Sequence, residues 1–509
     1  MIKRISWNII GQLVAFACSL GISFFLSPFV VNNLGTEVYG FVNLANTFTS
    51  YISLFTVAIT SMLSRYVTIE YSKKNFDGAS QYFSSALITQ GILAAIILLP
   101  ALFLTYNLES VVNISTTYVF DVKILWGLIF LSFLISLPGG CLSVGSFASN
   151  RLDLKSIVTV VSNLTRVIIL VITFVIFTPH VWYVGLATIC SEIITICGDY
   201  ILKKKQTPEI CLSVKSFRKE NIYDLVIVGV WNSISRLNQI LTTGLDLILT
   251  NLFINGYEMG ILSIAKSVPA QLGNLSGSIY AAFEPGMTIE YANENKQSFA
   301  NTTRYAMKLN GFLCAVPIIG FTCFGKAFYS LWMSSLTETE VNKVFLLAIL
   351  TLLPQIFEIY IQPLYAVNTI TKRIKLPVII NLFAGILNVL IVFTLLNISQ
   401  LGVYAIASVS SIIGIIKIFT FYPLYAAKSV GINWRSFYLP LIKGVINTFA
   451  LIILFEIVLI NITIATWTKL IIVALCCGAG GYILSFFIIF DNQEKNKLFA
   501  MLKNRMLKN

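Results

Sequence analysis

Charged residues are scarce in this chain of 509 residues, and histidine is almost absent. Only 11% of the residues are charged, and His180 is the single histidine, whereas an ordinary soluble domain carries roughly 25% charged residues. The nine cysteines show no paired spacing of the metal-binding kind. The sequence also lacks a Walker motif, a Gly-rich phosphate loop and a nucleophile elbow. These absences exclude a soluble domain and predict a protein without metal, without cofactor and without direct use of ATP.

Long apolar runs recur along nearly the whole chain. Hydrophobic residues make up 57% of the chain, and runs of about 20 residues are long enough to cross a bilayer as helices. The pattern predicts an all-α polytopic membrane protein with about fourteen transmembrane helices. We expect these near 5–31, 38–64, 81–106, 122–148, 156–178, 181–202, 224–252, 258–284, 304–325, 341–368, 376–397, 401–425, 437–461 and 464–490.

The positions of the basic residues predict how the chain is oriented in the membrane. Most lysines and arginines fall in the loops and termini on one side of the predicted membrane, and four lie near the other side: Lys123, Lys326, Lys343 and Lys469. Cytoplasmic loops are enriched in lysine and arginine, so both termini are predicted to be cytoplasmic. Because the positive charge is spread over many loops, it indicates topology and does not indicate a nucleic-acid partner.

A repeated tetrapeptide suggests that the chain contains two related halves. The letters TIEY occur at residues 68–71 and again at 288–291, a shift of 220. The same shift superimposes further residues: Gly40 on Gly260, Ala45 on Ala265, Ile59 on Ile279 and Asn75 on Asn295. Six helices separate the copies, so both have the same orientation, as in parallel repeats. The alternative is that apolar helices of similar composition resemble one another by chance.

The repeat predicts two parallel six-helix lobes with two additional helices at the C-terminal end. The predicted ranges are an N-terminal lobe at 1–205, a cytoplasmic linker at 206–221, a C-terminal lobe at 222–428, the additional helices at 429–492 and a basic cytoplasmic tail at 493–509.

Polar side chains form rows on the predicted seventh and second helices. Steps of three and four residues join Asn232, Arg236, Gln239, Thr243, Asp246 and Thr250, which predicts one polar stripe on the seventh helix. Asn43 and Asn46 belong to a similar row on the second helix, and the repeat places Ser263 and Lys266 at the equivalent positions of the eighth. We therefore expect the first, second, seventh and eighth helices to line a cavity.

Cations inside the predicted spans are expected to be paired, near an interface or in a wet cavity, since each costs roughly 3 kcal/mol at the centre of a bilayer. Lys308, Lys417 and Lys443 are expected to reach an interface. Arg166 and Lys266 are the strongest candidates for unpaired positive charge, and Arg236 either joins them or forms structural contacts with Asp246. A wet, cationic cavity suits an anion, and a guanidinium fits phosphate oxygens. The amide and hydroxyl rows suit sugars, so a phosphate-linked saccharide is the favoured substrate.

Three acidic residues in the spans are candidates for ion coupling: Asp246, Glu358 and Glu192. They either neutralise the cations or titrate. Without a nucleotide site, transport is expected to depend on the membrane potential or on H⁺ or Na⁺.

The opening of the chain, RISWNIIGQLVAFACSLGISFFLSPFVVNNLGTEVYGFVNLANTF, resembles polysaccharide exporters of the multidrug/oligosaccharidyl-lipid/polysaccharide (MOP) superfamily. In these exporters a first helix is followed by a short LG…YG turn, here Leu34-Gly35 and Tyr39-Gly40, and many members close the second helix with an arginine, here Arg65. The predicted spans and the half-repeat extend the resemblance over the chain. It implies a MATE-like fold.

The resemblance further implies a lipid-linked oligosaccharide flippase, similar to O-antigen flippases. Such a protein moves undecaprenyl-diphosphate-linked repeat units from the cytoplasmic to the periplasmic leaflet of the bacterial inner membrane, by ion-driven alternating access. The glycan would be O-antigen, capsule or another exopolysaccharide, and a polysaccharide polymerase is an implied partner. The alternative is a MATE-like drug exporter that uses Asp246, Glu192 or Glu358 to bind its substrate. An enzyme is not favoured, because the loops near 107–121 and 326–340 are short and lack an acid–base pair.

Overall fold

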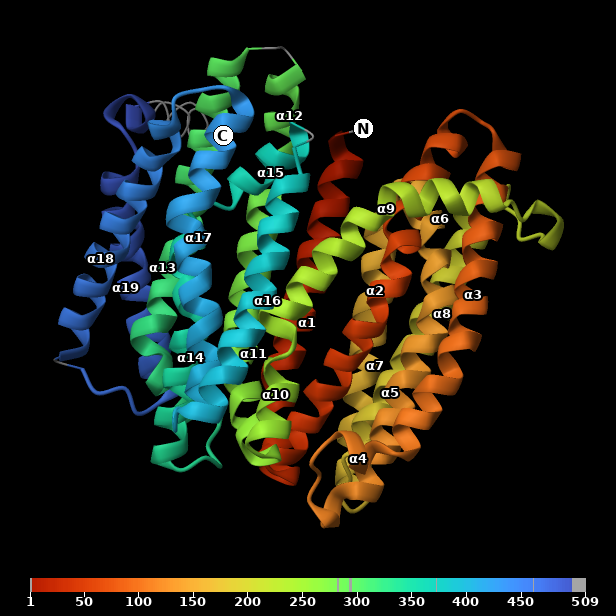
Figure 1. The fold of residues 1–509 in the computed structure, drawn as a ribbon, viewed down its shortest axis with the longest axis horizontal. Coiled ribbons are helices and arrows are strands. Elements are labelled where there is room, and N and C mark those ends of the chain that lie inside the picture. Colours follow the sequence, from red (N-terminus) through yellow and green to blue (C-terminus); the bar gives the residue numbers. More distant parts are fainter. Residues whose placement is uncertain (1, 282, 293–294, 372, 461, 497–509) are drawn as a thin grey trace. The chain divides into compact units, whose positions relative to one another are not determined.

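The computed structural model describes residues 2–281, 283–292, 295–371, 373–460 and 462–496, and within these ranges the secondary structure is helical, without a strand (Figure 1). A membrane-spanning segment cannot hydrogen-bond its backbone to lipid, and a helix satisfies its own N–H and C=O groups. The predicted all-α polytopic class is therefore confirmed.

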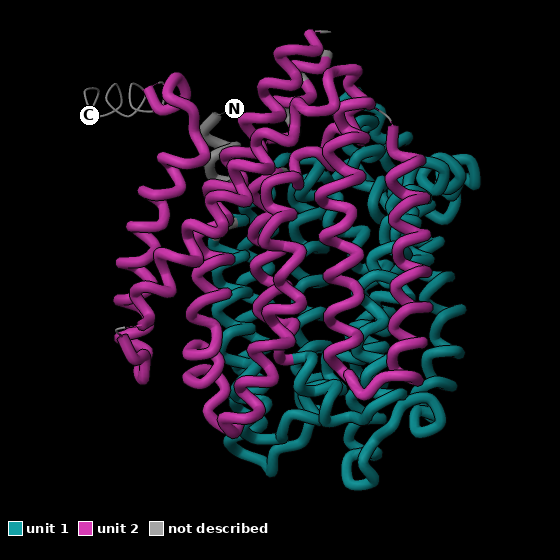
Figure 2. Tube along the Cα trace, turned by 60° about the vertical axis from the view of Figure 1, so that its left-hand side comes forward, with its two compact units in different colours: residues 1–263 teal, residues 264–509 magenta. Residues whose placement is uncertain are grey.

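The residues divide into two compact units, Met1–Ser263 and Ile264–Asn509 (Figure 2). The long helices of the first unit are α1 (Ile2–Leu34), α2 (Thr36–Ser72), α3 (Phe76–Tyr106), α5 (Val119–Gly140), α7 (Leu152–Ile176), α8 (Trp182–Gln206) and α9 (Lys219–Gln239). Shorter elements are α4 (Leu108–Val111), η1 (Thr116–Tyr118), η2 (Cys141–Ser143), α6 (Val144–Ala148), η3 (Val214–Ser216), η4 (Ile240–Gly244) and α10 (Asp246–Phe253).

Helix α11 (Gly256–Ala281) runs across the boundary into the second unit. That unit continues with α12 (Glu284–Ala292), α13 (Lys296–Trp332), α14 (Glu338–Glu358), α15 (Pro363–Ile370), α16 (Lys375–Ile398), α17 (Val403–Val430), η5 (Trp434–Phe437), α18 (Tyr438–Ile460) and α19 (Trp467–Ile489).

Twelve helical segments of the described chain are long and apolar enough to cross a membrane, and they coincide with twelve of the predicted spans. The protein is thus a multi-pass membrane protein. The two predicted spans that do not qualify, near 224–252 and 258–284, contain the polar rows of the seventh and eighth helices. Their polar side chains lower the mean hydropathy, so the count of fourteen remains a prediction.

The boundary between the units differs from the boundary between the predicted lobes, because α9 packs closely along α2. Gly229 lies so near that an added Cβ would come within 1.8 Å of the Ala58 carbonyl oxygen. The hydroxyl of Tyr51 donates to the carbonyl of Gly244 at 2.5 Å. Packing therefore places α9 and α10 with the first unit. The predicted lobe ranges remain a prediction, and residues 497–509 of the predicted tail lie outside the described residues.

The segment that follows α8 is held against α3 by a row of serines. The backbone N–H of Cys211 donates to Ser80 Oγ at 3.0 Å, and that of Ser213 donates to Ser84 Oγ at 3.1 Å. The N–H of Arg218 donates to Ser85 Oγ at 2.8 Å. The predicted linker is thus fixed to the first unit along its length.

Equivalent residues of the predicted repeat make equivalent caps. Asn75 precedes α3 and accepts a hydrogen bond from Gly78 N at 3.0 Å. Asn295, at a shift of 220, precedes α13 and accepts from Ser298 N at 3.0 Å. A side chain that satisfies a free N–H group of the first turn fixes where a helix begins. Both TIEY segments therefore end just before a capped helix.

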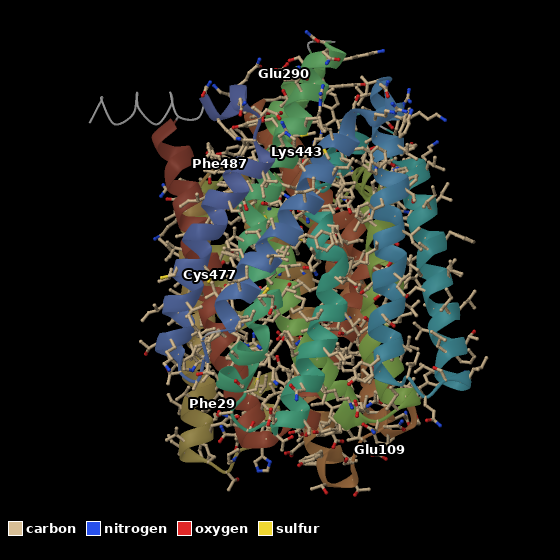
Figure 3. The ribbon with its side chains drawn as sticks, turned by 90° about the vertical axis from the view of Figure 1, so that its left-hand side faces the viewer. Phe29, Glu109, Glu290, Lys443, Cys477 and Phe487 are labelled. Carbon is tan, nitrogen blue, oxygen red and sulfur yellow. The ribbon has the colours of Figure 1, made fainter. Side chains whose placement is uncertain are left out.

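An ion-pair cluster joins the last helix of the chain to the rest of the second unit. Lys308 of α13 is buried and donates to Asp491 at 2.6 Å and to Glu494 at 2.8 Å. Lys443 of α18, near the same end of this unit as Glu290 (Figure 3), also pairs with Asp491. The expectation that Lys308 and Lys443 reach an interface stays a prediction. Their acidic partners lie just after the end of α19 and are distant from both lysines in sequence.

We predict that this cluster makes stability depend on acid pH. The two lysines lower the pKa of Asp491 to about 2, whereas an unfolded aspartate titrates near roughly 3.9. The carboxylate therefore stabilises the fold above about pH 4, and this contribution is lost as the pH falls toward about 2. Melting of the detergent-solubilised protein should show this loss, and Asp491→Asn should melt lower at pH 7 and flatten the acid dependence.

Glu109→Gln is the control for this prediction. Glu109 forms an exposed pair with Lys123 at 2.5 Å, which is expected to contribute about 0.5 kcal/mol or less. Identical acid melting curves for the parent and Asp491→Asn would contradict the proposed contribution.

Candidate functional site

Arg166 is a cation without a partner in the part of the chain that the structure describes. It lies on α7, and its Nε is buried without a hydrogen-bond acceptor. Tyr39 of α2 is close enough to interact with it electrostatically. The hydroxyls of Tyr39 and Ser27 are 3.1 Å apart, and on α7 Asn163 Nδ2 donates to Ser19 Oγ at 2.7 Å. Arg166 therefore belongs to a polar neighbourhood built by α1, α2 and α7.

A buried guanidinium without an acceptor is costly, because a charge taken from water needs a partner or a hydrogen bond in exchange. Arg166 remains charged at any physiological pH. A fold that keeps such a group gains little stability from it. The N–H donors of Arg166 suit an anion with planar or tetrahedral oxygens, such as a carboxylate or a phosphate.

A second cation of the same helix is paired, in contrast. Lys155 donates to Asp199 of α8, and Asp199 is only 2% exposed. Glu192 lies about two turns before Asp199 on α8, and it interacts electrostatically with both Lys155 and Asp199. The half-buried Glu192 has no hydrogen-bond partner among the described residues. The structure thus brings this predicted coupling residue next to Lys155 and Asp199, a pair that sequence reasoning did not join.

The predicted stripe of the seventh helix is broken, and the expectation of one continuous face is wrong. The segment η4 is a π-helix between α9 and α10. A π-turn carries more residues than an α-turn, so the positions that follow it rotate around the helix axis. Gln239, just before the π-helix, and Thr243, within it, are exposed, whereas Asp246 and Thr250, which follow it, are buried.

The predicted residues of the seventh helix mostly have local partners. Arg236 donates to Gln239 Oε1 at 2.5 Å, and Thr243 donates to the Gln239 carbonyl at 3.3 Å. Asn232 Nδ2 donates to Ser61 Oγ of α2 at 3.0 Å. Asp246 lies near Tyr51, whose hydroxyl binds the adjacent Gly244 carbonyl. Arg236 and Asp246 are thus on different sides of the break.

On α2 and α11 the predicted residues differ in exposure. Asn43 Nδ2 donates to Ser263 Oγ at 2.6 Å, so it contacts its own equivalent under the repeat. Asn46 is exposed. Lys266 is half-buried in the second unit and interacts with another residue of the chain. The expectation that Lys266 carries an unpaired charge is therefore wrong.

Glu358 lies where the predicted tenth helix is interrupted. The span predicted near 341–368 is interrupted, because α14 ends at Glu358 and α15 begins at Pro363. Tyr365 donates to Glu358 Oε1 at 2.8 Å. Lys417 of α17 interacts electrostatically with Glu358 and donates to Asn381 of α16 at 3.1 Å. Lys417 therefore has a polar partner and does not depend on an interface.

The interruption is stabilised by residues that sequence reasoning missed. Asn310 of α13 donates to the carbonyl of Ile359 at 2.7 Å. Tyr360 fits against Gly311 and Gly444, where added Cβ atoms would lie 2.2 Å and 2.4 Å from its ring. The signals in the sequence were Pro363, which starts a helix well, and the two glycines. Neither signal identifies its partner.

Among the described residues no group of three or more histidine, cysteine, aspartate or glutamate side chains could hold a metal ion. The arrangement offers groups that bind by charge and hydrogen bond: a cationic position at Arg166, and carboxylates at Glu192, Asp246 and Glu358.

Comparison with known proteins identifies the family. Residues 2–283 match the family model described as "Polysaccharide biosynthesis protein". The chain belongs to the polysaccharide biosynthesis protein family. A relative from Bacillus subtilis (strain 168), "Uncharacterized membrane protein EpsK", is 27% identical over 444 residues, which cover 86% of each chain.

Solved structures share the fold. An inward-facing multidrug resistance MATE family transporter of the MOP superfamily matches with a TM-score of 0.71 and 14% identity, over 84% of this chain and 98% of that one. The lipid II flippase MurJ, in an inward closed conformation, matches with a TM-score of 0.66 and 14% identity, over 94% of this chain and 97% of that one. The predicted MATE-like fold is thereby confirmed.

Within this polysaccharide biosynthesis protein, the contrast between two cations of α7 gives a prediction about stability. Arg166→Met removes a buried charge without a partner and should stabilise the fold by about 1 kcal/mol or more. Lys155→Met leaves Asp199 buried without its counter-charge and should cost about 3–5 kcal/mol. Thermal unfolding in one detergent measures both. A lower melting temperature for Arg166→Met would show that Arg166 has a stabilising partner.

Proposed function

We propose that this protein is a flippase for undecaprenyl-diphosphate-linked oligosaccharide repeat units. It carries them from the cytoplasmic to the periplasmic leaflet of the bacterial inner membrane, for O-antigen, capsule or exopolysaccharide synthesis, by ion-driven alternating access. The observation that carries the proposal is the half-buried Arg166, whose buried Nε has no hydrogen-bond acceptor among the described residues, in a member of the polysaccharide biosynthesis family. Both termini lie in the cytoplasm in this proposal, and a polysaccharide polymerase uses the product.

The chemistry of the diphosphate supports this substrate class. A lipid diphosphate brings negative charge into the protein, and a guanidinium binds phosphate oxygens through several N–H groups at once. Arg166 is the first contact we assign to the diphosphate, with Arg236 and Lys266 as further contacts. The amides and hydroxyls of Asn43, Asn46, Asn232, Gln239 and Thr243 are assigned to sugar hydroxyls.

We predict that removing the assigned cations stops transport without removing the protein. Arg166→Ala, Arg236→Ala and Lys266→Ala should each reduce surface polysaccharide by roughly tenfold or more, which corresponds to the loss of a charge-assisted hydrogen bond. The assay compares strains at matched membrane levels of the protein. Lys204→Ala is the control, since Lys204 is an exposed cation at the end of α8. Normal polysaccharide in all three variants would refute the assignment.

Glu358 is the coupling residue that we favour over Asp246 and Glu192. It lies at a helix interruption between α14 and α15, and interrupted helices are where transporters with broken helices bind Na⁺ or H⁺. Its contacts with Tyr365 and Lys417 come from other helices. Binding or release of an ion at Glu358 would therefore change contacts among α14, α15 and α17.

We predict that Glu358→Gln uncouples transport from the ion gradient. Flipping of lipid-linked oligosaccharide in proteoliposomes should respond to H⁺, Na⁺ or the membrane potential in the parent, and this response should be lost in the variant. Glu338→Gln is the control, because Glu338 lies on the same helix with its side chain 84% exposed. Flipping by the parent that is unchanged when every gradient is collapsed would refute ion coupling.

A MATE-like exporter of drugs or small molecules is the second candidate. The observation in its favour is the structural likeness to a multidrug transporter together with a carboxylate at Glu358. A deletion strain separates the two candidates. Drug sensitivity with normal surface glycan would favour the exporter, and loss of glycan with unchanged drug resistance would favour the flippase.

A further inference from the structure

Helices α2 and α11 cross with their backbones in contact. An added Cβ at Gly260 would lie 2.2 Å from the Thr36 carbonyl oxygen, and one at Gly40 would lie 3.0 Å from the Gly260 Cα. An added Cβ at Gly256 would lie 3.0 Å from Oε1 of the Glu37 side chain. Small residues four apart allow helices in a membrane to approach this closely. A side chain at Gly260 would prevent the crossing as it stands.

The contact joins residues that the repeat makes equivalent. Gly40 touches Gly260, and Asn43 donates to Ser263, each pair separated by 220 positions. In a structure with two copies of one repeat, equivalent residues touch each other only near the axis that relates the copies. The crossing therefore lies where a twofold relation between the halves would place its axis, at the end of α2 away from its basic residues.

Polar contacts surround the crossing at this end. Asn113 donates from N to Asn251 Oδ1 at 2.8 Å, and Asn251 Nδ2 donates back to the Asn113 carbonyl at 3.0 Å. Ser115 Oγ donates to Glu37 at 2.6 Å. The segment before η1 thus ties the start of α2 to the end of α10. These bonds hold α10 in place beside α2, so that α11 enters its crossing from a fixed position.

We propose that the α2–α11 crossing is the outer gate of the transporter, which closes by glycine backbone contact and the Asn43–Ser263 hydrogen bond and separates to release cargo. This inference rests on the proposed function. Glycine contact gives a dry, close seal with no side chain to rearrange. The hydrogen bond across it is replaced by bonds to water when the helices part, so opening has a small net cost.

The first test links the two sides of the gate. Asn43→Cys/Ser263→Cys and the control Ser162→Cys/Ser191→Cys are made in full-length protein without its native cysteines. The control pair is also in contact, with its hydroxyls 2.7 Å apart, and it joins α7 to α8. Both pairs lie within the first unit, so they differ only in the helices that they link. A short thiol crosslinker should abolish flipping only in the gate pair, and a cleavable crosslinker should allow recovery after reduction.

The outcomes separate the gate from the proposed function. Equal flipping by both crosslinked pairs would overturn the gate while leaving the flippase intact. A parent that flips no lipid-linked oligosaccharide would refute the proposed function, and the gate is then decided by a second measurement that needs no cargo.

That measurement is the labelling of Asn43→Cys by a membrane-impermeant maleimide from the outer side. Gly260→Ala should increase the labelling rate, because its methyl group cannot fit against Thr36. Gly91→Ala is the matched control, since nothing lies within 4 Å of a Cβ at Gly91. Equal labelling rates in the two alanine variants would overturn the gate, whatever the cargo is.

Discussion

Every polar group within the membrane-spanning part of this protein has to find its partner inside the chain, and the rest of the structure follows from this constraint. It explains why charged residues are few. It also explains why Asn310 reaches the free carbonyl at the interruption after α14, and why Lys308 has two acidic partners. Where no polar side chain joins two helices, glycines let the helix backbones approach until they are in van der Waals contact, as at Gly229 and Gly260.

Against this background a polar group without a partner is informative. Lys155 and Arg166 lie on the same helix, Lys155 at the edge of the predicted span 156–178 and Arg166 within it. Lys155 is neutralised by Asp199, whereas Arg166 has a buried Nε with no acceptor among the described residues. That one cation is paired and the other is not supports our proposal that Arg166 binds a ligand with its own negative charge. The comparison between the two residues, more than the mere presence of arginine, supports a site.

The sequence predicted the helices well and their interruptions poorly. Hydropathy is a local property, so twelve spans could be placed from the residues alone. The π-helix at Ile240–Gly244 and the break after Glu358 depend on Tyr51, Asn310 and Tyr360, which come from other helices. The pairing of Lys308 with Asp491 was hidden for the same reason, because the two residues are distant in sequence. The 220-residue register made Gly40 and Gly260 equivalent positions, but their contact became visible only in the structure.

The same register relates the interruptions of the two halves. A shift of 220 takes Pro138, just before the 3₁₀ turn η2, to Glu358, where α14 ends. In the first half the turn is closed by packing, with Ile196 filling the space beside Gly139. In the second half a carboxylate occupies the same position and binds Tyr365. Paired interruptions of this kind mark binding regions in repeat transporters. Only one of the two copies carries an ionisable group at this position, and this difference supports the proposal that Glu358 takes part in ion coupling.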